Sequence, residues 1–128
     1  MSYPTDRKYT KEHEWITADG TIGITHYAQD SLGDIVFVEL PKVRTEITAG
    51  KPFGTVESVK AVSELYTPVS GEVVDTNKGA VAEPGIVNDD PYGDGWLIKL
   101  KLSADEEIGK LMSAEQYAEY VKSEEKAK

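Results

Sequence analysis

The feature that most constrains the fold is a series of short apolar segments between Ile22 and Leu102, each closed by a turn-forming residue. Gly, Pro and Asn or Asp interrupt the apolar pattern before it reaches the length of a packed helix. Closely spaced segments of this kind are typical of an all-β sandwich or barrel. Six strands are expected, over residues 22–25, 34–40, 51–58, 63–67, 71–75 and 95–102.

The segment 34–40 has apolar residues at successive positions. Ile35 and Phe37 alternate with Val36 and Val38. Since neighbouring side chains on a strand point to opposite faces, this order predicts one strand with both faces partly covered.

A short helix is expected between Thr25 and Gly33. The Thr25 hydroxyl can accept a hydrogen bond from a free amide of the first helical turn. Gly33 can adopt the left-handed conformation that often ends a helix.

The C-terminal region predicts two more short helices, within a helical segment of about 104–123. Capping boxes occur at 103–106 and 113–116, where Ser is followed three residues later by Glu or Gln. Tyr117, Tyr120 and Val121 have the spacing of one helix face, so this face should pack on the β core.

Length and charge limit the classes of function. A chain of 128 residues fits a single domain, 1–128. Its formal net charge of −9 disfavours nucleic acid and anionic membrane surfaces as partners. The absence of Cys excludes a disulfide framework and a cysteine nucleophile. With no apolar leader or membrane-spanning stretch, a cytoplasmic location is expected.

The segment 54–71 is the part of the chain that suggests chemistry. It places Lys60 between two strand-like arms, where a tight hairpin would expose the amine to an acylating enzyme. Exposure alone carries little information, because most surface lysines are solvated charges.

The residues around Lys60 resemble the attachment hairpin of lipoyl domains: Glu57, Ser58, Val59 and Ala61. In the related biotin carriers, the modified lysine lies between two methionines. Since Lys60 lies between Val59 and Ala61, biotin is the poorer fit.

The resemblance extends over nearly the whole chain and is specific to the H-protein family of the glycine cleavage system. Four blocks occur in the order found in that family: 9–15 (YTKEHEW), 22–29 with 32–41 (IGITHYAQ and LGDIVFVELP), 57–61 (ESVKA) and 88–96 with Pro91, Tyr92 and Gly95.

This resemblance implies a mainly β fold of the barrel-sandwich hybrid type. The expected architecture is a flattened β barrel of the lipoyl-domain type, with short flanking helices, two of them C-terminal. It further implies a carrier without catalytic activity of its own, with lipoate joined covalently to Lys60.

The resemblance also implies the partners. The arm would take an aminomethyl group from the glycine decarboxylase (P protein) to the tetrahydrofolate-dependent aminomethyltransferase (T protein). Dihydrolipoamide dehydrogenase (L protein) would reoxidise the dithiol, and lipoate-attaching enzymes would load Lys60. The cofactor would bring the sulfurs that the cysteine-free chain lacks.

Two acidic residues are implied to form a cleft for the loaded arm: Glu14 and Glu64. By residue type alone, both would be solvated surface carboxylates. At position 12 many members of the family carry a small hydroxyl residue, so Glu12 should make the edge of the cleft more negative here.

Two alternatives stay open at this point. An enzyme could use Lys60 as a Schiff-base nucleophile, which would require a desolvated amine in a pocket. An H-like paralogue could relay lipoyl groups to other enzymes. We expect a monomer, a structural or surface role for His13 and His26, and core positions for Trp15 and Trp96.

Overall fold

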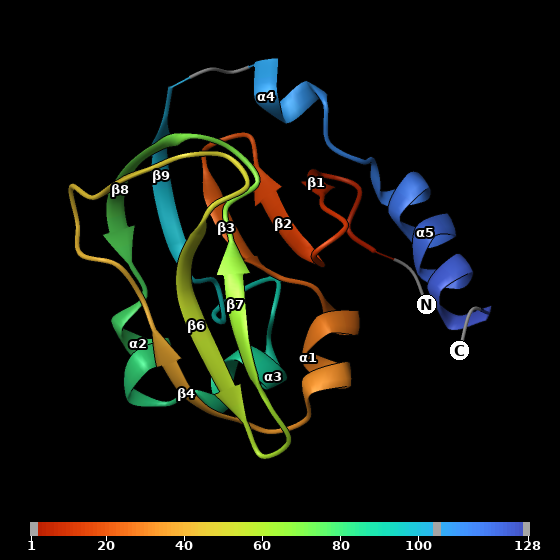
Figure 1. The fold of residues 1–128 in the computed structure, drawn as a ribbon, viewed down its shortest axis with the longest axis horizontal. Helices are drawn as coiled ribbons and strands as arrows, with labels where there is room; N and C mark the ends of the chain where they lie inside the picture. The colour runs from red at the N-terminus through yellow and green to blue at the C-terminus, as the bar shows by residue number, and fades with distance from the viewer. Residues whose placement is uncertain (1–2, 104–105, 127–128) are drawn as a thin grey trace.

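The strands form two antiparallel sheets that face each other (Figure 1). This computed structural model describes residues 3–103 and 106–126. The larger sheet has the strand order β1-β2-β3-β9-β8-β5 and the smaller has the order β4-β6-β7. The strands of the larger sheet are β1 (Arg7–Tyr9), β2 (Glu14–Thr17), β3 (Thr21–Ile24), β5 (Glu46–Ile47), β8 (Gly71–Thr76) and β9 (Ile98–Leu102). Those of the smaller sheet are β4 (Ile35–Glu39), β6 (Pro52–Ser58) and β7 (Val62–Tyr66).

The main core lies between the inner faces of the two sheets. Val38, Val56 and Leu65 of the smaller sheet are buried in one apolar cluster with Ile22 and Ile98 of the larger sheet. Burying an aliphatic side chain of this size contributes about 1.5–3 kcal/mol. The smaller sheet therefore packs on the larger sheet through its inner face.

Helix α1 (His26–Leu32) connects the two sheets. Thr25 Oγ1 accepts a hydrogen bond from the Ala28 amide at 3.2 Å, and Gly33, with a φ of 78°, ends the helix. Two further helices, α2 (Lys78–Ala82) and α3 (Gly85–Asp89), lie between β8 and β9.

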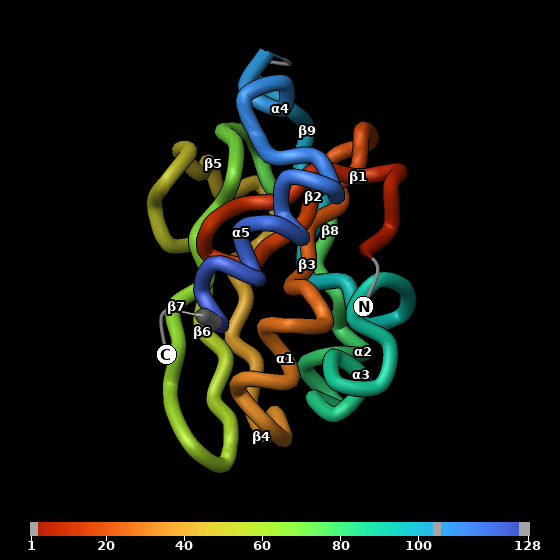
Figure 2. Tube along the Cα trace, turned by 90° about the vertical axis from the view of Figure 1, so that its right-hand side faces the viewer, coloured from red at the N-terminus to blue at the C-terminus, as the bar shows by residue number. Residues whose placement is uncertain are grey.

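The C-terminal part forms α4 (Glu106–Gly109) and α5 (Ala114–Lys126). Ser113 and Gln116 form the expected capping box, with reciprocal hydrogen bonds of 2.9 and 3.2 Å. The other box, 103–106, includes residues 104–105, which lie outside the described residues. Figure 2 shows α5 beside the N-terminal strands, and Tyr117 and Val121 are buried there in a second cluster with Tyr9 and Trp15.

The predicted mainly β fold with short helices is confirmed, and all six expected strands are present within one or two residues at most boundaries. Within the described residues the strands form two sheets and no closed barrel. The sequence analysis missed β1, β2, β5, α2 and α3, which are two to five residues long. Segments so short carry too few positions for a periodic pattern.

The predicted alternation along β4 is wrong. Ile35 and Val38 are buried, whereas Val36 and Phe37 are both exposed. The pairing of β4 with β6 shifts register between Ile35 and Phe37. Such a bulge adds one residue to a strand, so the residues beyond it change face.

In the described part of the chain, no helix is long and apolar enough to cross a membrane.

Candidate functional site

Lys60 lies in the turn that joins β6 to β7. The Ser58 amide donates to the Ala61 carbonyl at 2.8 Å. Ser58 Oγ accepts hydrogen bonds from the amides of Lys60 and Ala61, each at 3.1 Å. These bonds close a three-residue turn and leave Val59, Lys60 and Ala61 exposed. The sequence therefore fixes a lysine at the tip of a hairpin.

The tip also contacts the end of α1. The Val59 amide donates to the Asp34 carbonyl at 3.0 Å. A methyl group placed on Gly33 would lie 3.4 Å from Lys60 Cε, so the methylene stem of Lys60 passes over this glycine. The methylene groups of Lys60 thus lie beside Gly33, while the Lys60 side chain remains exposed to solvent.

A cavity of about 290 Å³ opens between this hairpin and α1. Its apolar wall comes from α1, and polar groups line its other sides. Its lining residues include Glu12, Tyr27, Ala28, Leu32, Ser63 and Glu124. A long acyl chain on Lys60 would find both apolar surface and carboxylates beside its attachment point.

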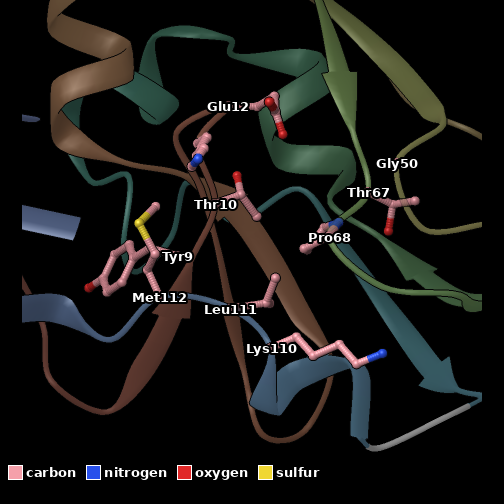
Figure 3. Close-up of a pocket in the computed structure, with 10 residues that line it drawn as sticks. Tyr9, Thr10, Glu12, Gly50, Thr67, Pro68, Lys110, Leu111 and Met112 are labelled. Carbon is pink, nitrogen blue, oxygen red and sulfur yellow. The ribbon is translucent and has the colours of Figure 1, made fainter. Parts of the chain in front are cut away.

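Glu12 connects this cavity to two further hollows. It lines a hollow of about 310 Å³ together with Gly50 and Tyr66. Figure 3 shows the other, a hollow of about 280 Å³ between Glu12, Pro68 and Leu111. Hence Glu12 lines three adjoining spaces.

Glu14 is buried, which corrects the expectation of a solvated carboxylate based on residue type. Its side chain is 2% exposed. Oε2 accepts a hydrogen bond from the Tyr66 amide at 2.8 Å, and Thr10 Oγ1 lies 3.3 Å from Oε1. Burial raises the pKa of Glu14 to about 8, so this group is protonated at neutral pH.

Glu64 lies on the exposed side of β7, as its residue type suggested. Its carboxylate accepts a hydrogen bond from the Tyr66 hydroxyl at 3.0 Å. Tyr66 therefore contacts both acidic residues: its backbone amide donates to Glu14, and its hydroxyl donates to Glu64. The carboxyl groups of Glu14 and Glu64 do not line one common pocket, since Glu14 is buried and Glu64 is exposed.

The far wall of the cavity is tied to the aromatic cluster. His13 Nδ1 lies 2.8 Å from the Tyr117 hydroxyl, which lies 2.7 Å from Thr25 Oγ1. His13 Nε2 lies 3.5 Å from a Glu124 carboxylate oxygen. These contacts give His13 a structural role and fix α5 against the start of α1.

Trp15 is a core residue, as expected. Its side chain is 1% exposed, and Nε1 donates to the carbonyls of Ile24 and Pro91 at 2.9 and 3.0 Å. Trp96 is partly buried against the same cluster.

The arrangement fits a covalent acyl arm better than a catalytic lysine. Lys60 is exposed in a turn, whereas a Schiff-base lysine needs a desolvating pocket. The sequence analysis did not identify Tyr27, Ala28, Leu32 and Ser63 as cavity residues. The only signal for Tyr27, Ala28 and Leu32 was the half-polar face of α1, which is common to surface helices, and Ser63 of β7 carried none.

Comparison with known proteins agrees with this site. Residues 7–124 match the family described as Glycine cleavage H-protein. A glycine cleavage system H protein of Carboxydothermus hydrogenoformans is 55% identical over 124 residues, covering 94% of this chain and 95% of the relative. One of Staphylococcus saprophyticus is 54% identical, covering 94% of this chain and 98% of the relative.

A solved structure agrees in fold. The crystal structure of a glycine cleavage system H protein from Mycobacterium marinum superposes with a TM-score of 0.84 at 44% identity. The match covers 91% of this chain and 97% of that chain. The resemblance found in the sequence is confirmed, and the chain belongs to the glycine cleavage H-protein family.

Proposed function

We propose that this chain is the lipoyl-bearing carrier of a glycine cleavage system and that Lys60 is its attachment residue. The observation that carries the proposal is the exposed Lys60 on a turn closed by Ser58, beside a cavity with an apolar wall. Glu57, Ser58, Val59 and Ala61 would form the motif that identifies this lysine to the enzyme that acylates it.

Lipoate bound through an amide to Lys60 supplies two sulfurs that can be oxidised, reduced and loaded with a one-carbon unit. The residues of this chain position and shelter that arm. The hairpin fixes its root, which raises its effective concentration at a docked active site. Leu32 and Ala28 offer apolar contact, and Glu12 offers a carboxylate to a cationic end group.

Glu14 and Glu64 remain our proposed acidic residues of the arm cleft. Glu64 would act as an exposed carboxylate on the hairpin. Glu14 would act as a positioning residue. It accepts a hydrogen bond from the amide of Tyr66, and Tyr66 lines a hollow together with Glu12.

The partners proposed for this carrier are the glycine decarboxylase (P protein), the aminomethyltransferase (T protein), dihydrolipoamide dehydrogenase (L protein) and lipoate-attaching enzymes. It would carry the aminomethyl group between the first two and have no catalytic activity of its own. A monomeric state and a cytoplasmic location complete the proposal.

The test is lipoylation followed by intact-mass measurement and a peptide map. The full chain is incubated with a lipoate-attaching enzyme, lipoate and ATP. We expect one lipoyl group, on Lys60, and none on Lys60→Arg. Lys51→Arg removes another exposed lysine at the start of the same hairpin and should be modified like the wild type. Modification at a different lysine, or none, would refute the assignment.

A further inference from the structure

Exposed apolar side chains gather around Lys60. In the described part of the chain, seven large hydrophobic residues are exposed, and four of them lie on β4 or the hairpin: Val36, Phe37, Val59 and Val62. Val62 is 66% exposed and Phe37 is 48% exposed. A local concentration of exposed apolar side chains of this kind commonly marks an interaction site.

Strand pairing places these residues on one face. Phe37 is paired with Glu57, and Glu57 is paired with Val62, so the three form a row across the smaller sheet. Val38 and Val56, which follow and precede this row on their strands, are buried on the inner face. The row therefore lies on the outer face, one pairing step from the Lys60 turn.

Among the described residues, no helix covers the part of this outer face that β6 and β7 form. In Figure 1 β6 and β7 lie in front of the rest of the molecule, and in Figure 2, a quarter turn away, they form its edge. The bulge in β4 extends the apolar area, because it turns Val36 outward next to Phe37.

Carboxylates lie within and beside this row, since Glu57 is its middle member, between Phe37 and Val62. Glu39 is paired with Thr55 and Thr55 with Glu64 in the next row of the same face. Within the described residues, Glu39, Glu57 and Glu64 form no ion pair. A second copy of this chain would bring like charges together, whereas a partner with a basic contact face would neutralise them.

We propose that the outer face of β4, β6 and β7, centred on Phe37 and Val62, docks the enzyme that acylates Lys60. That enzyme would present apolar groups to Phe37 and Val62 and basic groups to Glu57 and the neighbouring carboxylates. The inference rests on the proposed function. Because the Lys60 turn has only three residues, an enzyme that reaches the amine itself must also contact the flanking strands. An enzyme that reacts with the far end of a long arm needs no such contact.

The test compares rates of Lys60 lipoylation at saturating lipoate and ATP while the concentration of the carrier is varied. Phe37→Ser and Val62→Thr should each lower kcat/KM for the carrier by about tenfold, mainly through KM. Val74→Thr is the matched control, because Val74 is 47% exposed on β8, away from the hairpin. It should stay within about twofold of the wild type.

A second pair of variants tests the charge of the partner. Glu39→Gln should weaken docking at low salt and reduce the salt dependence of KM. Glu46→Gln removes an exposed carboxylate on β5 and should change neither. Circular dichroism and urea unfolding verify that each variant keeps the wild-type fold.

The possible results test the docking surface and the carrier function separately. If the wild type is lipoylated on Lys60 but Phe37→Ser and Val62→Thr behave like Val74→Thr, the docking surface is refuted and the carrier function stands. If Lys60 is not lipoylated at all, both are refuted. A dimer in light scattering that Phe37→Ser converts to a monomer would assign the face to a second copy and overturn the proposal.

Discussion

The two sheets differ in how much of each is covered. The larger sheet packs against the smaller sheet and also contributes Tyr9 and Trp15 to the aromatic cluster under α5. The smaller sheet is buried on one face only, and its outer face exposes Phe37 and Val62. The stable part of the molecule and the part that carries Lys60 are thus different sheets.

This difference shows how a small carrier can satisfy two demands. A well-packed region holds the fold, so a hairpin with one exposed face can stay accessible to other proteins. Substitutions in the two regions should therefore separate stability from recognition.

The largest effect on stability is expected from Trp15→Ala. The change leaves a cavity and removes the donor to the Ile24 and Pro91 carbonyls, at a cost of about 3–5 kcal/mol. Phe37→Ala, on the exposed face, should cost below about 1 kcal/mol. Urea unfolding measures both, and similar losses would remove the distinction between the sheets.

The next effect concerns pH and Glu14. Because the folded pKa is raised to about 8, above its ordinary value of 4.5, stability from this group is fully present below 4.5 and is lost as pH rises toward 8. Glu14→Gln lacks this loss, so its free energy of unfolding relative to that of the wild type should rise by about 3–4 kcal/mol between pH 5 and 8. Glu64→Gln controls for the removal of one exposed acidic side chain. A pH-independent difference for Glu14→Gln would contradict the prediction.

A smaller loss is expected from Tyr117→Phe. The buried hydroxyl lies between His13 Nδ1 and Thr25 Oγ1, and its removal leaves both without this partner. Unfolding free energy should fall by about 1–2 kcal/mol. Tyr120→Phe loses only exposed hydrogen bonds, one of 3.3 Å to the Lys11 carbonyl and one with Glu124, and should change stability by less than half of that. Equal losses would argue against a special role for the buried network.

The smallest change in stability is expected from Ser58→Ala. The variant loses the acceptor for the Lys60 and Ala61 amides at an exposed turn, at a cost of about 0.5–1 kcal/mol. Its effect on Lys60 lipoylation should be larger than this cost suggests, because the turn positions the amine. Ser58→Asn keeps a side-chain acceptor and should restore most of the lipoylation rate. A Ser58→Ala variant that is lipoylated at the wild-type rate would show that the turn needs no such support.

Local sequence patterns determined much of the fold. Thr25 and Gly33 set the two ends of α1, and Ser113 with Gln116 begins α5. These features depend on neighbouring residues and on turn chemistry, which are visible in the chain itself. The prediction of Lys60 on a hairpin arose from a strand–turn–strand pattern and from resemblance to a known family.

Tertiary structure decided what local patterns could not. Glu14 has an acidic side chain within a polar block, yet it is buried where the two sheets meet, and it accepts a hydrogen bond from the Tyr66 amide, 52 residues away in the chain. The bulge in β4 places Phe37 on the opposite face from Ile35, although simple alternation predicts the same face for both. The cavity combines Leu32 of α1 with Ser63 of β7 and Glu124 of α5. Such outcomes depend on contacts between distant segments, and a periodic pattern within one segment does not contain them.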